Sequence, residues 1–135
     1  MIQQDIEEEK LILQETCFSY AKEIINSRQK LIPFGAFINM QNEIIIEDPV
    51  LKLDLKENRI EHLSNKLNRL FYIKKIKVWT ICFDAFLNQK ESKIKDAFCI
   101  EIHQGNLNPM THLYYPYKWD NNNNLTFSEP IFKKV

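Results

Sequence analysis

The chain contains only two glycines among its 135 residues, Gly35 and Gly105. Loops that bind phosphate groups need several glycines at fixed spacing, because the backbone must approach the ligand closely. The scarcity of glycine therefore excludes a P-loop and a dinucleotide-binding fingerprint. This is the most decisive exclusion that the sequence provides.

The chain also lacks a surplus of charge of either sign. The 18 Lys and Arg residues balance the 18 Asp and Glu residues, so the formal net charge is +0 at pH 7. Proteins that bind nucleic acids usually carry a basic surplus that neutralises phosphates. We therefore expect no nucleic-acid partner.

No apolar run is long enough to span a bilayer, and the acidic start of the chain lacks the apolar core of a signal peptide. We therefore expect a cytoplasmic protein with no membrane partner. The three cysteines, Cys17, Cys82 and Cys99, are odd in number and do not have the spacing of a zinc site. This pattern favours free thiols in a reducing compartment, and we expect no metal and no cofactor.

Apolar residues, by contrast, are plentiful. They make up 44% of the chain, and aromatic residues make up 12%. This composition is typical of a folded protein with a packed core, and the length is that of one domain, so we predict a single domain over residues 1–135.

The stretch 73–118 has the pattern of a three-strand antiparallel meander. Large apolar residues alternate with smaller or polar ones in 79–84 and in 97–103, and a third run, 111–118, follows a second polar loop. Pairing Phe83 with Phe98 would place the large residues of both strands on one face. The same register would place Cys82 opposite Cys99 on the second face.

The rest of the chain supplies two helices and a hairpin. Apolar residues recur at helical spacing from about 3 to 28 and from about 58 to 72. Two short strands, 36–39 and 43–47, surround Gln41 and Asn42, which suit a hairpin turn. We predict an α+β fold: a single antiparallel sheet of about five strands with two helices packed on one face, in the order α-β-β-α-β-β-β, and a short C-terminal strand within 125–132.

Polar groups converge on the second face of this predicted sheet. Asp84, Glu101 and His103 would lie there, and Glu101 with His103 could form a general acid–base pair. Adding His112 would extend the set toward a metal site. The simpler interpretation is a half-exposed sheet that presents polar side chains to water, and this interpretation is favoured, so we assign no catalytic and no metal-binding residue.

Aromatic side chains are concentrated in the last strand of the meander. Alternation places Tyr115 and Tyr117 on one face and Tyr114 on the other, and Trp119 follows. Tyr and Trp provide much of the binding energy at protein interfaces. The alternative is that these rings pack on the core with their hydroxyls at its rim.

The order of elements resembles that of the small profilin-like and roadblock-like sensory and scaffold domains. Short motifs also resemble a group of small, uncharacterised bacterial proteins, some thought to travel with toxin–immunity loci: the sequence 33–36 (PFGA), the hairpin after it, Asp96-Ala97 and Pro116-Tyr117. The resemblance spans most of the chain. It implies a bacterial cytoplasmic protein and supplies no catalytic residue.

Two functions follow from these observations. The favoured one is a non-catalytic module that binds a partner protein or a second copy of itself, and that is immunity-like if the resemblance holds. Its binding residues would be Tyr114, Tyr115, Tyr117, Trp119, Glu101 and His103. The alternative is a small enzyme or ligand-binding domain that uses Asp84, Glu101 and His103 in a cleft.

Overall fold

The computed structural model describes residues 2–47, 56–87, 96–103 and 111–134. Within these residues, two helices and seven strands follow one another: α1 (Ile2–Asn26), β1 (Phe34–Asn39), β2 (Ile44–Glu47), α2 (Lys56–Tyr72), β3 (Ile76–Phe86), β4 (Asp96–His103), β5 (Thr111–Trp119), β6 (Leu125–Phe127) and β7 (Ile131–Lys134).

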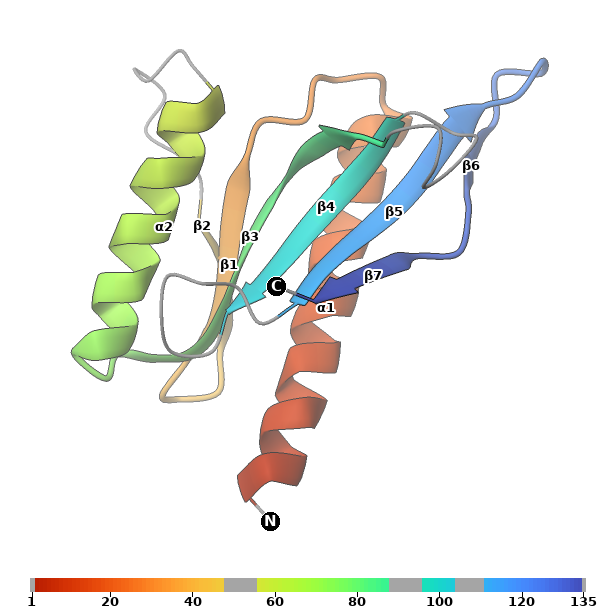
Figure 1. The fold of residues 1–135 in the computed structure, drawn as a ribbon. Coiled ribbons are helices and arrows are strands. Elements are labelled where there is room, and N and C mark those ends of the chain that lie inside the picture. The colour runs from red at the N-terminus through yellow and green to blue at the C-terminus, as the bar shows by residue number, and fades with distance from the viewer. Residues whose placement is uncertain (1, 48–55, 88–95, 104–110, 135) are drawn as a thin grey trace.

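The strands form one antiparallel sheet in the order β2-β1-β3-β4-β5-β6, and β7 pairs with β5 beside β6 (Figure 1). The predicted α+β class and the single antiparallel sheet are confirmed. The sheet has seven strands rather than about five, because the C-terminal tail contributes two short strands along the outer edge of β5.

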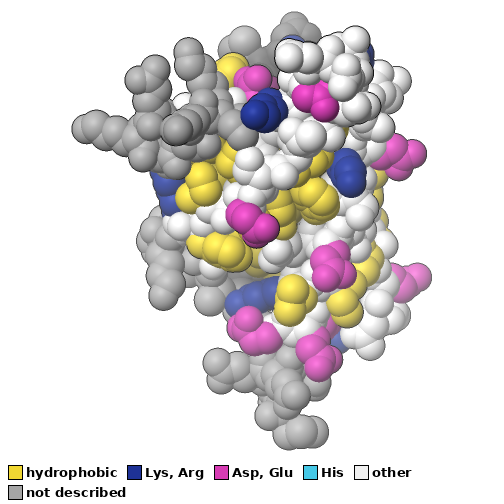
Figure 2. Space-filling view, turned by 90° about the vertical axis from the view of Figure 1, so that its right-hand side faces the viewer, with side chains coloured by type: hydrophobic (Ala, Val, Ile, Leu, Met, Phe, Trp, Pro, Cys, Tyr) yellow, Lys and Arg dark blue, Asp and Glu magenta, His cyan; other side chains and the backbone are white. Residues whose placement is uncertain are grey.

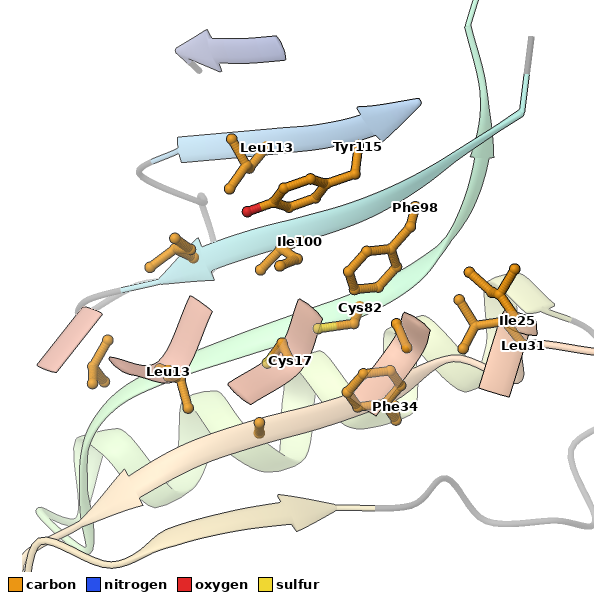
Figure 3. Packing of buried hydrophobic residues seen from close by; sticks show 14 of the residues in the cluster. Leu13, Cys17, Ile25, Leu31, Phe34, Cys82, Phe98, Ile100, Leu113 and Tyr115 are labelled. Atoms are coloured by element: carbon orange, nitrogen blue, oxygen red, sulfur yellow. The ribbon is translucent and has the colours of Figure 1, made fainter. Parts of the chain in front are cut away.

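The helices cover opposite faces of the sheet, so the prediction that both pack on one face is wrong. Leu13 and Cys17 of α1 belong to one buried cluster, whereas Leu63 and Leu67 of α2 belong to another. In Figure 3, α1 lies nearest the viewer and the sheet separates it from α2. We call the two clusters the α1-side core and the α2-side core.

The strands divide their side chains between these two cores. Within β1, Ala36 and Ile38 face the α1-side core, and Phe37 between them faces the α2-side core. Neighbouring residues of β3 likewise face the two cores in turn. Such alternation is expected when each strand has a covered face on both sides.

The predicted register between β3 and β4 is wrong by one residue. Phe83 pairs with Cys99 rather than with Phe98, and Cys82 pairs with Ile100. A shift of one residue exchanges the faces of a strand. Consequently, the large side chains of β3 and those of β4 point to opposite sides, and each contributes to a different core.

The predicted helices and the predicted hairpin are confirmed. The helices begin and end within two residues of the expected bounds, and Asn42 has the positive φ, 64°, that its turn position favours. In the described part of the chain, neither helix combines the length and the apolar character needed to cross a membrane.

Gly35 lies where β1 passes closest to α2. A methyl group there would meet Leu67 Cδ1 at 2.8 Å and the Thr80 carbonyl oxygen at 3.3 Å. Leu67 is fully buried and has little room to move, so we expect Gly35→Ala to lower the free energy of unfolding by about 1–3 kcal/mol in urea titrations. Adding Leu67→Val should relieve the contact. The double variant should then lose less free energy of unfolding than the two single variants lose together. If the two losses simply add, this contact does not limit packing.

Candidate functional site

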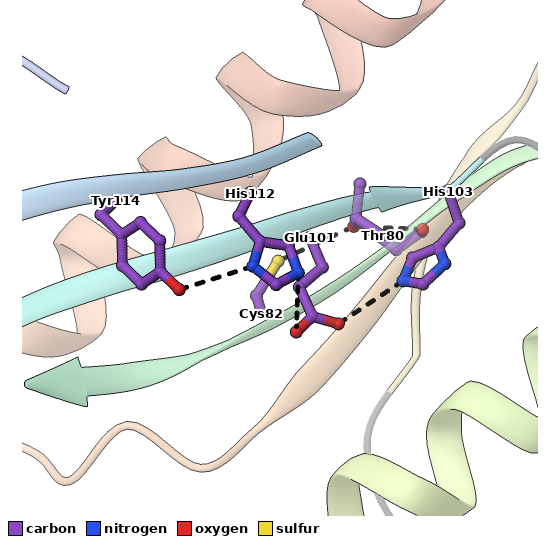
Figure 4. Close-up of polar contacts among 7 residues, drawn as sticks. Thr80, Cys82, Glu101, His103, His112 and Tyr114 are labelled. Carbon is purple, nitrogen blue, oxygen red and sulfur yellow. Dashed lines mark hydrogen bonds and ion pairs between the residues drawn. The ribbon is translucent and has the colours of Figure 1, made fainter. Parts of the chain in front are cut away.

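A polar cluster is centred on Glu101, on the α2 side of the sheet (Figure 4). The Glu101 carboxylate lies 3.5 Å from Nε2 of His103 and 3.4 Å from Nε2 of His112. The Tyr114 hydroxyl lies 3.5 Å from Nδ1 of His112. The register places Glu101 directly opposite His112, which brings the residues of β4 and β5 together. We call these four residues the Glu101 cluster.

The Glu101 cluster is largely withdrawn from solvent. His103 is 1% exposed, and its ring stacks on that of Trp79 with centroids 3.9 Å apart. The side chains of Glu101 and His112 keep 17% and 22% of their surface exposed. Each carboxylate oxygen thus lies within ion-pair distance of one imidazole nitrogen. The arrangement brings three ionisable side chains together beside the α2-side core.

Asp84 does not belong to this cluster. It pairs with Phe98 in the sheet, and Phe98 faces the α1-side core. The sheet therefore separates Asp84 from Glu101 and His103, and the acid–base trio that the sequence suggested is not assembled. Within the described residues, no group of three or more His, Cys, Asp or Glu side chains is placed to hold a metal ion.

The aromatic side chains of β5 point to the two faces of the sheet in the way that the sequence alternation predicted. Tyr114 lies with the Glu101 cluster, whereas Tyr115 and Tyr117 pack on the α1 side. Tyr115 is buried: its ring lies 4.5 Å from that of Phe18, and Gln14 donates a 2.9 Å hydrogen bond to its hydroxyl. Tyr115 is thus part of the core and does not present its ring to a partner.

Trp119 lies in a shallow cleft beyond the C-terminal end of α1. The cleft has a volume of about 370 Å³. Its lining comprises Ile25, Arg28, Gln29, Lys30, Leu31, Asp84, Tyr117 and Trp119. We call it the Trp119 cleft. Trp119 and Tyr117 are both partly exposed, unlike Tyr115.

Arg28 is held in place over Trp119. The centre of its guanidinium lies 3.9 Å from the ring centroid, a cation–π contact, and the guanidinium donates a 3.3 Å hydrogen bond to Oδ1 of Asn123. Arg28 has a φ of 61°. Its N–H bonds to the carbonyl of Ile25, and the next N–H bonds to that of Ile24, as in a Schellman C-cap. The helix terminus therefore aims Arg28 at Trp119.

No pattern in the sequence indicated a role for Arg28. Its contact with Trp119 joins the end of the first helix to the end of β5, and no local pattern connects the two. Trp119 and Tyr117 were identified because their residue types and their position on one strand are local properties.

The cysteines are arranged differently from the prediction. Cys82 faces the α1-side core, whereas Cys99 pairs with Phe83 on the other side of the sheet. Cys82 instead lies near Cys17, and the Thr80 hydroxyl is 3.3 Å from the Cys17 sulfur and 3.7 Å from that of Cys82. All three are reduced thiols, and all three are buried. Burial raises the pKa of the Cys82 thiol, which keeps it neutral in this core.

Comparison with protein-family models, with curated proteins and with solved structures finds no match for this chain.

The tyrosines of β5 should make stability depend on pH. Burial raises the pKa of both Tyr115 and Tyr117, and the nearby Asp96 and Asp84 carboxylates raise that of Tyr117 further. The unfolded chain releases these protons near pH ~10, whereas the folded chain retains them. The free energy of unfolding should therefore fall as the pH rises above ~10.

Denaturant titrations between pH 8 and pH 11 would measure this fall. Tyr117→Phe should reduce it, with Tyr72→Phe, at an exposed tyrosine, as the control. An equal fall in the wild type and in Tyr117→Phe would contradict the prediction for Tyr117.

Proposed function

We propose that the protein is a non-catalytic interaction module that binds a partner protein at the Trp119 cleft. The observation that supports this proposal is the partial exposure of Trp119 and Tyr117 in a hollow that also holds Arg28. Trp, Tyr and Arg are the residue types enriched at binding hot spots.

The surroundings of the cleft suit an interface. Figure 2 views the molecule from the side of β5, β6 and β7, where apolar side chains are exposed across the face with acidic and basic ones among them. Exposed apolar side chains gathered on one face commonly mark a site of association. Arg28 is already ordered by Trp119 and Asn123, so less side-chain freedom would be lost when a partner binds.

The alternative, a small enzyme or ligand-binding domain, is favoured by one observation, the Glu101 carboxylate between two imidazoles. We rank it second for two reasons. Asp84 lies on the other side of the sheet, and His103 is nearly inaccessible, whereas a catalytic base must reach its substrate.

The resemblance to small bacterial proteins suggests what the partner is. If the chain is immunity-like, it acts in the bacterial cytoplasm and its partner is a toxin. The Trp119 cleft would then be the place where the toxin is recognised.

Trp119→Ala should weaken the complex by about 2 kcal/mol or more, about 30-fold in Kd, because the ring would be a buried anchor. Partners captured by the wild-type protein and by the variant would be quantified, and the purified partner would be titrated by calorimetry. Tyr72→Ala is the matched control, since Tyr72 is an exposed aromatic residue, 66% accessible, at the end of α2 and away from the cleft.

Circular dichroism would establish that each variant is folded. The proposal fails if no captured protein depends on Trp119, or if Tyr72→Ala weakens the complex as much as Trp119→Ala.

A further inference from the structure

A second exposed apolar surface lies at the opposite end of the sheet from the Trp119 cleft. Figure 1 shows that the β1–β2 turn, the α2–β3 connection and the N-terminal half of α1 all lie at this end. Five large apolar side chains are exposed there: Ile12 (48%), Met40 (45%), Ile44 (38%), Tyr72 (66%) and Ile73 (56%). We call these five residues the hairpin-end surface.

Two hollows lie at this end, one on each side of the sheet. The first, of about 410 Å³, is lined by Ile12 and Ile44 on the α1 side, and the second, of about 330 Å³, by Met40 and Tyr72 on the α2 side. Lys77, at the start of β3, lines both. Several large apolar side chains exposed at one end of a protein commonly mark a site of association.

Opposite charges flank the hairpin-end surface. On the α1 side, Glu7 and Glu8 are exposed, and Glu8 lines the first hollow. On the α2 side, Lys74 and Lys75 are exposed, and Lys74 lines the second hollow. Lys77, between the two hollows, lies 3.5 Å from Glu9. The surface thus has an acidic margin and a basic margin, and between them the exposed apolar side chains surround the Lys77–Glu9 ion pair.

We infer that the occupant of the hairpin-end surface is a second copy of this chain, related by a two-fold axis. In such an isologous contact, the same patch meets itself in the reverse direction. The acidic margin of each copy then faces the basic margin of the other, and the exposed apolar side chains between the margins meet. A uniformly acidic or basic partner would be repelled at one of the two margins.

The balanced charge of the whole chain agrees with self-association. Its formal net charge is +0, so two copies do not repel each other at long range, and proteins near zero net charge associate more readily. This inference does not rest on the Trp119 cleft, because the two surfaces share no lining residue.

Charge reversal provides a sharp test. One variant carries Glu7→Lys and Glu8→Lys, so both of its margins are basic. The other carries Lys74→Glu and Lys75→Glu, so both of its margins are acidic. We expect wild-type protein to sediment as a dimer, each variant alone to dimerise at least tenfold more weakly, and an equimolar mixture of the two variants to recover dimers.

Sedimentation velocity over a concentration series would measure these constants, and circular dichroism would confirm folding. Glu23→Lys and Lys118→Glu, at exposed positions outside the surface, are the matched controls and should dimerise as the wild type does. Should a reversed variant not fold, Tyr72→Ser between the margins should also weaken the dimer at least tenfold.

Three results would overturn the inference: a wild-type protein that stays monomeric at every concentration, reversed variants that dimerise normally, or assembly that continues beyond the dimer. A dimer that Trp119→Ala abolishes and charge reversal leaves intact would also overturn it, and would place self-association at the Trp119 cleft instead. Loss of the hairpin-end dimer with an intact Trp119-dependent complex would separate the two proposals.

Discussion

The side chains of β3 alternate between two cores, and each core belongs to a different helix. Trp79 and Ile81 pack beneath α2, whereas Val78 and Cys82 pack beneath α1. Thr80 also points toward α1, and its hydroxyl lies 3.3 Å from the carbonyl of Ala36. An unpaired hydroxyl in such a core would cost about 1–3 kcal/mol. Because β3 is covered on both faces, β1 beside it presents apolar side chains to both cores. On its other side, β4 presents apolar side chains to the α1-side core but Glu101 and His103 to the α2 side.

This double coverage explains what the sequence could and could not predict. Helices, strands and turns follow from local patterns, and their positions are predicted to within a few residues. The pairing register between strands does not follow from local patterns, because alternation shows only which residues of one strand share a face. Placing Phe83 beside Phe98 assumed a single buried face. With two buried faces, a strand can present its large side chains to either, and only helix packing decides between them.

The same limit applies to the candidate site. The division of β5 into Tyr114 on one face and Tyr115 on the other depends on one strand alone, and it could be predicted. The separation of Asp84 from Glu101 depends on how two strands pair, so the error in register moved Asp84 to the wrong side. The role of Arg28 depends on where a helix ends relative to a distant strand. Properties set within one element or one short turn can therefore be predicted from this sequence, and those set by packing between distant elements cannot.

The scarcity of glycine has a structural consequence at both proposed surfaces. Helix ends commonly place glycine in the left-handed conformation, which other residues adopt at a cost of about 1–2 kcal/mol. Here Arg28 ends α1 with a φ of 61°, and Lys74 ends α2 with a φ of 60°. Glycine would cost less at either position but could place no charge there. Arg28 reaches Trp119, and Lys74 lies at the basic margin of the hairpin-end surface. Each strained helix end thus supplies a cation to one of the two proposed surfaces. Binding at that surface would offset the free-energy cost of the strained backbone.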